Sequence, residues 1–174
     1  MTTHLCTRNR ILIMDTDVLI NLLKKTEEKY LYAVITQLSL DYDAILIPKK
    51  VKKEFISLKP KRESDKHQRL LDNLYESFVS ERFMDCPINN SRMEIQQLID
   101  TSEQIGCLIQ IGEADAILQG KKCAELETLS EVYVLTGDKC AIEFINRHGE
   151  NLKVKPLPYE EWKKQFMEAG ITLP

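Results

Sequence analysis

Three short, purely apolar runs constrain the fold more than any other feature of this chain. They are four residues long each and cover Ile11–Met14, Ala44–Ile47 and Val132–Leu135. Such runs, with no alternating polar residue, are typical of strands buried on both faces of a parallel sheet. Segments whose apolar residues have helical spacing separate them. The sequence therefore predicts an α/β fold with a mainly parallel sheet flanked by helices.

The segments between these runs define the expected helices and the remaining strands. A short strand is expected over Arg82–Cys86, and Val154 is a candidate edge strand. The charged stretch 59–81 is expected to form a helix that projects from the body. We find no linker, repeat or low-complexity tract, so a single domain over 1–174 is predicted, with a helical insertion at about 59–110. Further helices are expected over 28–40, 49–58, 91–106, 112–128, 138–147 and 159–168.

Composition indicates an ordinary soluble protein, with 43% hydrophobic residues, 29% charged residues and a net charge of −3. No apolar stretch approaches the length of a membrane helix, and no signal peptide is recognised, so a cytoplasmic location and no membrane contact are expected. The cysteines occur singly, without zinc spacing, and are expected to be reduced. The three histidines lie in polar settings and are expected at the surface. The cysteines are Cys6, Cys86, Cys107, Cys123 and Cys140, and the histidines His4, His67 and His148.

Acidic residues occupy the places where a parallel α/β sheet holds its ligands, beyond the carboxyl ends of the strands. Asp15 directly follows the first apolar run, and Asp138 follows the last one by three residues. Glu54 falls beside an apolar helical stripe, where a carboxylate needs a partner. Asp115 lies in the first turn of a helix opened by Gly112. These acids are expected to converge on one site.

Converging carboxylates repel one another unless cations neutralise them, and hard oxygen ligands favour Mg²⁺ or Mn²⁺ over zinc. Two such ions can clamp the attacking and leaving oxygens of a phosphodiester. Each acid alone also has an ordinary explanation as a helix cap, a complement to a helix dipole or an ion-pair partner. The predicted catalytic and metal-binding set is Asp15, Glu54, Asp115 and Asp138, with Asp17 and Glu113 as further candidate ligands.

A basic block lies beside Glu54. Residues 49–69 contain nine basic and three acidic residues, although the whole chain is acidic. Such a block is suited to holding phosphates next to an acidic pocket, while a solvated helix face is the plainer alternative. The residues expected to contact a nucleic-acid substrate here are Lys49, Lys50, Lys52 and Lys53.

At these residues the chain resembles the PIN-domain nucleases. The resemblance rests on four segments in the family's order, ILIMDTDVLI, PKKVKKEF, GEADAIL and VYVLTGDK. It implies a PIN-like three-layer sandwich and a metal-dependent endoribonuclease that cleaves single-stranded or structured RNA. It also implies a toxin of a toxin–antitoxin pair, with an antitoxin protein as partner and homodimer formation.

The resemblance makes Asp15, Glu54, Asp115 and Asp138 the family's four acids in order, with Glu113 able to share or take the third role. Thr136 matches the polar residue before the last acid and is expected near the substrate. Two departures are evident. Asp17 stands where relatives commonly carry serine, threonine or asparagine, and the chain is longer than the compact family members, chiefly between the second and third acids.

Two other readings stay open. The string ILIMDTDVLI also resembles the opening motif of haloacid-dehalogenase-like phosphatases, in which Asp15 would be the nucleophile, although no separate lysine motif is evident. The second alternative is a PIN-like module that binds RNA or protein without cutting. Retention of four acids argues against this module, because a dead site has no reason to keep their mutual repulsion.

Overall fold

In this computed structural model, which describes residues 9–76, 82–126 and 130–174, the predicted apolar runs form neighbouring strands of a parallel sheet. The described strands have the order β3-β2-β1-β4-β5, and every pairing is parallel. Ile13 at the centre pairs with Leu46 on one side and Val134 on the other. The strands are β1 (Arg10–Met14), β2 (Ala44–Ile47), β3 (Phe83–Asp85), β4 (Glu131–Thr136) and β5 (Lys155–Pro158).

Helices connect these strands, as parallel pairing requires. The long helices of the described chain are α2 (Glu28–Asp41), α4 (Ser64–Glu76), α5 (Arg92–Gln104), α6 (Ile111–Leu126), α7 (Lys139–Leu152) and α8 (Tyr159–Glu168). The shorter ones are α1 (Thr16–Ile20), the π-helix η1 (Asn21–Lys25), α3 (Lys49–Ile56) and the 3₁₀ helix η2 (Lys61–Glu63). None of these helices is both long and apolar enough to cross a bilayer.

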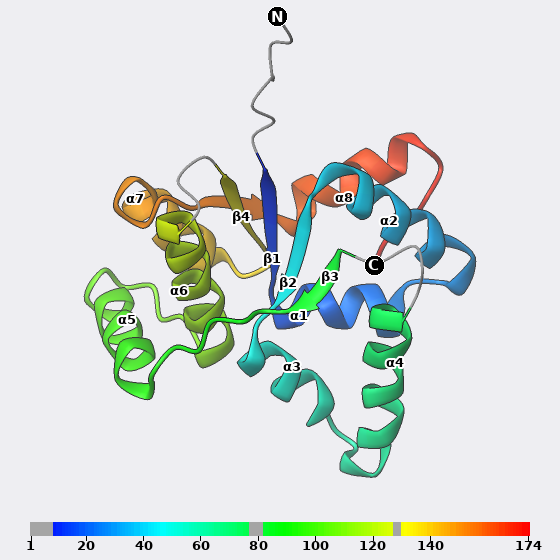
Figure 1. Ribbon diagram of the computed structural model, residues 1–174, viewed down its shortest axis with the longest axis horizontal. Coiled ribbons are helices and arrows are strands. Elements are labelled where there is room, and N and C mark those ends of the chain that lie inside the picture. Colours follow the sequence, from blue (N-terminus) through cyan, green and yellow to red (C-terminus); the bar gives the residue numbers. More distant parts are fainter. Residues whose placement is uncertain (1–8, 77–81, 127–129) are drawn as a thin grey trace, which may run out of the picture.

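Each face of the sheet has its own apolar core, because successive strand residues point to opposite sides. Leu12 and Met14 of β1 join a core formed with α1, α2, α3, α4 and α8, whereas Ile11 and Ile13 join a core formed with α5, α6 and α7. Figure 1 shows α2 and α8 on one side of the strands and α5, α6 and α7 on the other. The predicted α/β fold class, a parallel sheet between two helical layers, is confirmed.

The segment 59–110 contains a strand as well as helices. This strand, β3, lies between α4 and α5 in the sequence and forms one edge of the sheet. The expectation that the first helix of this segment projects from the body is wrong. Leu71 and Leu74 of α4 are buried in the core, and His67 is fully buried as well. The His67 ring lies 5.6 Å from that of Phe55, so the expected surface position of this histidine is also wrong. The burial of His67 is not evident from its polar sequence neighbours, because only one stripe of a helix is buried.

The other element boundaries differ by a few residues from those expected. The last strand is Lys155–Pro158, immediately after Val154. Helix α7 continues beyond Arg147 to Leu152 and ends at Lys153, which has a left-handed backbone with φ 54°. His148 in this helix is half-buried and stacks on Phe144 at 4.7 Å. The expected positions of His4, Cys6 and the helix end at Thr128 lie outside the described residues.

Candidate acidic site at the carboxyl edge of the sheet

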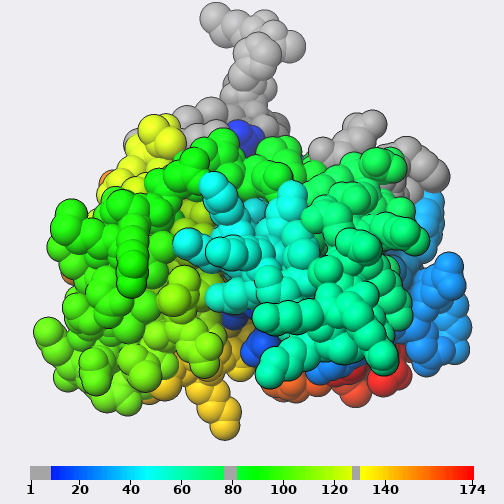
Figure 2. All heavy atoms as spheres, turned by 90° about the horizontal axis from the view of Figure 1, so that it is seen from below, coloured from blue at the N-terminus to red at the C-terminus, as the bar shows by residue number. Residues whose placement is uncertain are grey.

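A pocket of about 300 Å³ opens where β1 and β4 end, between α1, α3, α6 and the start of α7. Figure 2 views the molecule from below, and the blue atoms of the segment around α1 are visible between the cyan atoms of α3 and the yellow-green atoms of α6. The pocket brings together acids from four separate segments of the chain. Its lining residues are Asp15, Thr16, Asp17, Ile20, Glu54, Leu58, Gln110, Gly112, Glu113 and Asp138.

Asp15 is held at the base of this pocket by hydrogen bonds to both carboxylate oxygens. It caps α1, where its Oδ1 accepts the Thr16 N–H at 2.6 Å. Its Oδ2 accepts the Thr136 hydroxyl at 2.8 Å. The side chain is only 2% exposed, and burial raises the pKa of Asp15 to about 6, with Asp17 and Glu54 adding repulsion. The two donors fix the carboxylate while each oxygen keeps a lone pair for another partner.

Thr136 connects the two acids that follow the strands. Its hydroxyl donates to Asp15 and accepts the Asp138 N–H at 3.1 Å. Asp138 in turn caps α7, because its Oδ1 accepts the Ala141 N–H at 2.8 Å. Thr136 itself is fully buried. The substrate contact expected for Thr136 stays a prediction, and the arrangement shown is a buried hydroxyl that positions two acids.

Glu54 reaches the pocket from α3 and meets α1 and α6 there. Its Oε2 accepts the Thr16 hydroxyl at 2.6 Å. Gly112 makes room for this carboxylate, since a Cβ added at Gly112 would lie 2.5 Å from Glu54 Oε2. A larger residue than glycine in the first turn of α6 would therefore require the Glu54 carboxylate to move.

Glu113 is the acid of α6 that lines the pocket. Its Oε2 accepts the Gln110 N–H at 2.6 Å, so the side chain caps the start of its own helix. Burial raises the pKa of Glu113 to about 7, and repulsion from Asp15, Asp138 and Asp17 acts in the same direction. The pKa of Glu113 therefore depends on the charges of the other acids across the pocket.

Asp115 lies outside the residues that line this pocket. It is 2% exposed, and its Oδ2 accepts the Lys50 N–H of α3 at 3.2 Å, while its Oδ1 accepts Asn90 Nδ2 at 2.8 Å. The carboxylate thus supports the start of α3, which carries Glu54. The metal-binding and catalytic roles predicted for Asp115 stay predictions, and the place this structure gives it is a positioning one.

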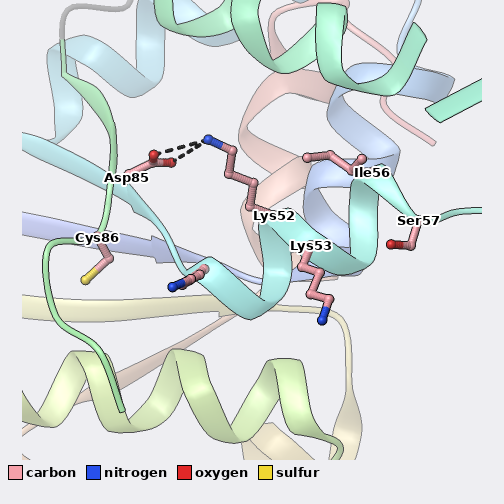
Figure 3. A pocket seen from close by; sticks show the side chains of 7 residues that line it. Lys52, Lys53, Ile56, Ser57, Asp85 and Cys86 are labelled. Atoms are coloured by element: carbon pink, nitrogen blue, oxygen red, sulfur yellow. Dashed lines mark hydrogen bonds and ion pairs between the residues drawn. The ribbon is translucent and has the colours of Figure 1, made fainter. Parts of the chain in front are cut away.

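The basic residues of α3 lie around a second, adjacent cavity. Lys49, Lys52 and Lys53 line a pocket of about 430 Å³ (Figure 3). Lys52 Nζ forms an ion pair with Asp85 at 3.1 Å, whereas Lys49 and Lys53 are exposed. Lys50 is half-buried, and its N–H is used by Asp115. The other residues of this lysine pocket are Ile56, Ser57, Asp85 and Cys86.

The acidic pocket has carboxylate oxygens of the kind that bind hard divalent cations, although these oxygens are spread apart. Among the described residues, no group of three or more carboxylate, histidine or cysteine side chains is already gathered closely enough to hold a metal ion. The repulsion among Asp15, Asp17, Asp138 and Glu113 opposes such gathering. A cation would remove this repulsion and draw the oxygens together. Carboxylate oxygens are the type of ligand that Mg²⁺ and Mn²⁺ prefer, and binding of either ion at this pocket stays a prediction.

Sequence reasoning missed several residues that organise the site. Thr16 and Gly112 both act on Glu54, and Asn90 and Gln110 hold Asp115 and Glu113. Gly112 carried a signal, because glycine at the start of a helix indicates either a cap or a close approach. The other three gave none, since a polar residue acquires its partner only when distant segments meet.

The fold and the pocket together define an α/β protein with an acidic cleft at the carboxyl edge of its parallel sheet. No family model matches the chain, and no curated protein shows a significant match.

Chains of two solved structures are similar in fold. One belongs to the structure of FitAB bound to an IR36 DNA fragment, with 14% identity, coverage of 85% of this chain and 94% of that chain, and a TM-score of 0.49. The other belongs to FitAcB from Neisseria gonorrhoeae, with 13% identity, coverage of 85% and 97%, and a TM-score of 0.48. Function has to be judged from the residues of this chain.

Proposed function

We propose that this protein is an Mg²⁺- or Mn²⁺-dependent endoribonuclease. The observation that carries this proposal is that five carboxylates, from α1, α3, α6 and the two strand ends, line one pocket. A metal-free enzyme would gain nothing from such mutual repulsion, whereas a site for hard cations needs these oxygens. The proposed ligands are Asp15, Asp17, Glu54, Glu113 and Asp138.

The third acid of the site is proposed to be Glu113, a choice that the sequence left open between Glu113 and Asp115. Glu113 lines the pocket with the other acids, whereas Asp115 is bound by Lys50 N–H and Asn90. Bound Mg²⁺ or Mn²⁺ would supply charge neutralisation for a phosphodiester and acidify a water molecule. The chain's own part is to fix the carboxylates, through the hydroxyls of Thr16 and Thr136.

RNA is the proposed substrate because a basic surface adjoins the acidic pocket. Helix α3 contributes Glu54 to the acidic pocket and Lys49 and Lys53 to the neighbouring lysine pocket. Phosphates on either side of the cleaved bond would be held by such lysines while the cleaved phosphate lies at the acids. Discrimination of RNA from DNA, an antitoxin partner and a homodimer follow from the resemblance and are proposed on that ground alone.

The phosphatase alternative is less well supported by the pocket. That chemistry places a lysine beside the nucleophilic aspartate and the transferred phosphate. The described residues that line the acidic pocket include neither lysine nor arginine. Asp15 also has both oxygens engaged by Thr16 and Thr136, which suits a fixed ligand better than an attacking group.

The decisive experiment is digestion of single-stranded RNA by wild type and Asp138→Asn, with Mn²⁺, with Mg²⁺ and with chelator. Asparagine caps a helix about as well as aspartate, so α7 keeps its cap and loss of activity reports on the site. Asp100→Asn, at an exposed position on α5, is the matched control. We expect metal-dependent cleavage that Asp138→Asn abolishes and Asp100→Asn retains.

Two results would contradict the proposal. Turnover of a chromogenic phosphate ester that requires Asp15, with RNA left intact, would establish a phosphatase. Tight RNA binding with no cleavage under any metal would establish a binding module. Copurification of a coexpressed neighbouring gene product, followed by light scattering, tests the proposed partner and the homodimer separately.

A further inference from the structure

Cysteines that are scattered singly along the sequence meet as two pairs in the fold. Cys86 directly follows β3 and shares a thiol hydrogen bond with Cys123 near the end of α6. Cys107, before α6, shares one with Cys140 in the first turn of α7. None of these four cysteines forms a disulfide in the structure. Two thiols within hydrogen-bonding distance are close enough for exchange with a common disulfide partner.

Cys86 of the first pair lines a cavity, whereas the second pair includes Cys140, which is half-buried. Cys86 lines the lysine pocket, together with Lys49, Lys52 and Lys53. Figure 3 shows its sulfur turned away from the ion pair of Lys52 and Asp85. Cys86 is 8% exposed and Cys123 is 7% exposed. A small reagent in the lysine pocket would therefore meet Cys86 first, with Cys123 as its partner.

The two pairs also differ in their electrostatic surroundings. The hydrogen bond with Cys123 lowers the pKa of the Cys86 thiol, which favours the reactive thiolate. Cys107 donates instead to Glu143 Oε2 at 3.1 Å, and this carboxylate raises the pKa of Cys107 to about 12. Lysines line the pocket beside Cys86, where Asp115 acts in the opposite direction, whereas Cys107 is in direct contact with the carboxylate of Glu143. The chain thus contains one thiol pair suited to exchange and one suited to stay reduced.

We propose that Cys86 is a redox-active thiol, reached through the lysine pocket by small anionic disulfides of the glutathione type, and that Cys123 is its resolving thiol. The Cys86 thiolate attacks one sulfur of the small disulfide, which forms a mixed disulfide and releases one thiolate. Cys123 then loses its proton to solvent and attacks the Cys86 sulfur. The second small thiolate leaves, so two protein thiols are oxidised and one small disulfide is reduced to two thiols.

The resulting link would join the edge strand to α6 and close a loop over residues 86–123. This loop contains α5 and most of α6, including Glu113, which lines the acidic pocket. Constraining a loop of this length in the unfolded chain is expected to raise the melting temperature by about 5 °C or more. Neither metal nor RNA takes part in the exchange, so its outcome is independent of the proposed nuclease activity.

The test uses the full chain with Cys6→Ser, so that the remaining thiols are those the structure describes. The reduced protein is exposed to glutathione disulfide under native conditions, alkylated and mapped by mass spectrometry without reduction. We expect a Cys86–Cys123 link. In Cys123→Ser a single glutathione should remain on Cys86, and in Cys86→Ser no glutathione should appear on Cys123. Cys140→Ser, the matched control, should behave as its parent.

The lysines are tested with two small disulfides of opposite charge. At low salt, glutathione disulfide should modify Cys86 at least about threefold faster than cationic cystamine, relative to their rates with a small free thiol, and Lys49→Gln with Lys53→Gln should abolish this preference. Equal relative rates would overturn the anionic preference. A first link between Cys107 and Cys140, or a Cys86 thiol that stays alkylatable after prolonged exposure, would overturn the redox pair.

Discussion

Replacement of Glu113 by glutamine should remove a pH-dependent cost from the metal-free protein. The pKa of this side chain is 4.5 in its ordinary state and about 7 in the fold, mainly because of burial. That difference corresponds to about 3 kcal/mol between the protonation states. Since Glu113 is only half-buried, solvent screening reduces the expected effect to about 1–2 kcal/mol.

The sign follows from the raised pKa. Between about pH 4.5 and pH 7 the folded protein holds a proton on Glu113 that the unfolded chain releases. The free energy of unfolding therefore falls as pH rises through this window, and the loss is complete above the folded pKa. Glu113→Gln should raise the melting temperature by about 2–6 °C at pH 8, and should change it little at pH 4.5. The Gln110 N–H keeps an amide oxygen as acceptor.

The assay is thermal unfolding in chelator at both pH values, then a Mn²⁺ titration at pH 8. Wild type should be stabilised by Mn²⁺, whereas Glu113→Gln should bind it about tenfold more weakly or worse. Asp115→Asn is the control, because Asp115 supports α3 through Lys50 N–H. The free energy of unfolding of Asp115→Asn should be lower by about 1–3 kcal/mol at both pH values, and Mn²⁺ should stabilise this variant as it stabilises wild type. The reverse pattern would refute this reasoning: Mn²⁺ would no longer stabilise Asp115→Asn, and it would stabilise Glu113→Gln as much as wild type.

The remaining predictions concern the groups around the acids. Thr16→Val removes the hydroxyl that donates to Glu54 and should weaken Mn²⁺ binding about 10- to 100-fold by calorimetry, while circular dichroism stays unchanged. Gly112→Ala places a Cβ 2.5 Å from Glu54 Oε2, so it should displace the carboxylate and abolish stabilisation by Mn²⁺. Alanine itself favours the helix by about 1 kcal/mol, so a loss of metal binding would not reflect a weaker helix. Retained metal affinity would show that Glu54 is not a ligand. Lys53→Gln should lower the salt dependence of RNA binding by about one in log–log slope, measured by fluorescence anisotropy.

The strand-end acids were predictable because the main chain alone places them. A buried parallel strand needs an unbroken apolar run, and the residue after it must lie at the ligand-binding edge. Asp15 and Asp138 therefore line the pocket as their positions indicated. Glu54 was predictable in part, from the apolar stripe beside it. The buried side of α4 was not, since His67 and Leu71 lie in a charged segment whose partner is the distant Phe55.

The sequence by itself determined the parallel α/β architecture and the edge at which its acids collect, since both follow from local patterns of apolar and acidic residues. Only the tertiary structure decided that Glu113 of α6 faces the pocket and that Asp115 supports α3. Residues two apart on a helix point in widely different directions, and packing alone selects the inward one. The same reason applies to Cys86 and Cys123, whose pairing depends on the residue after β3 meeting α6 across 37 positions of sequence.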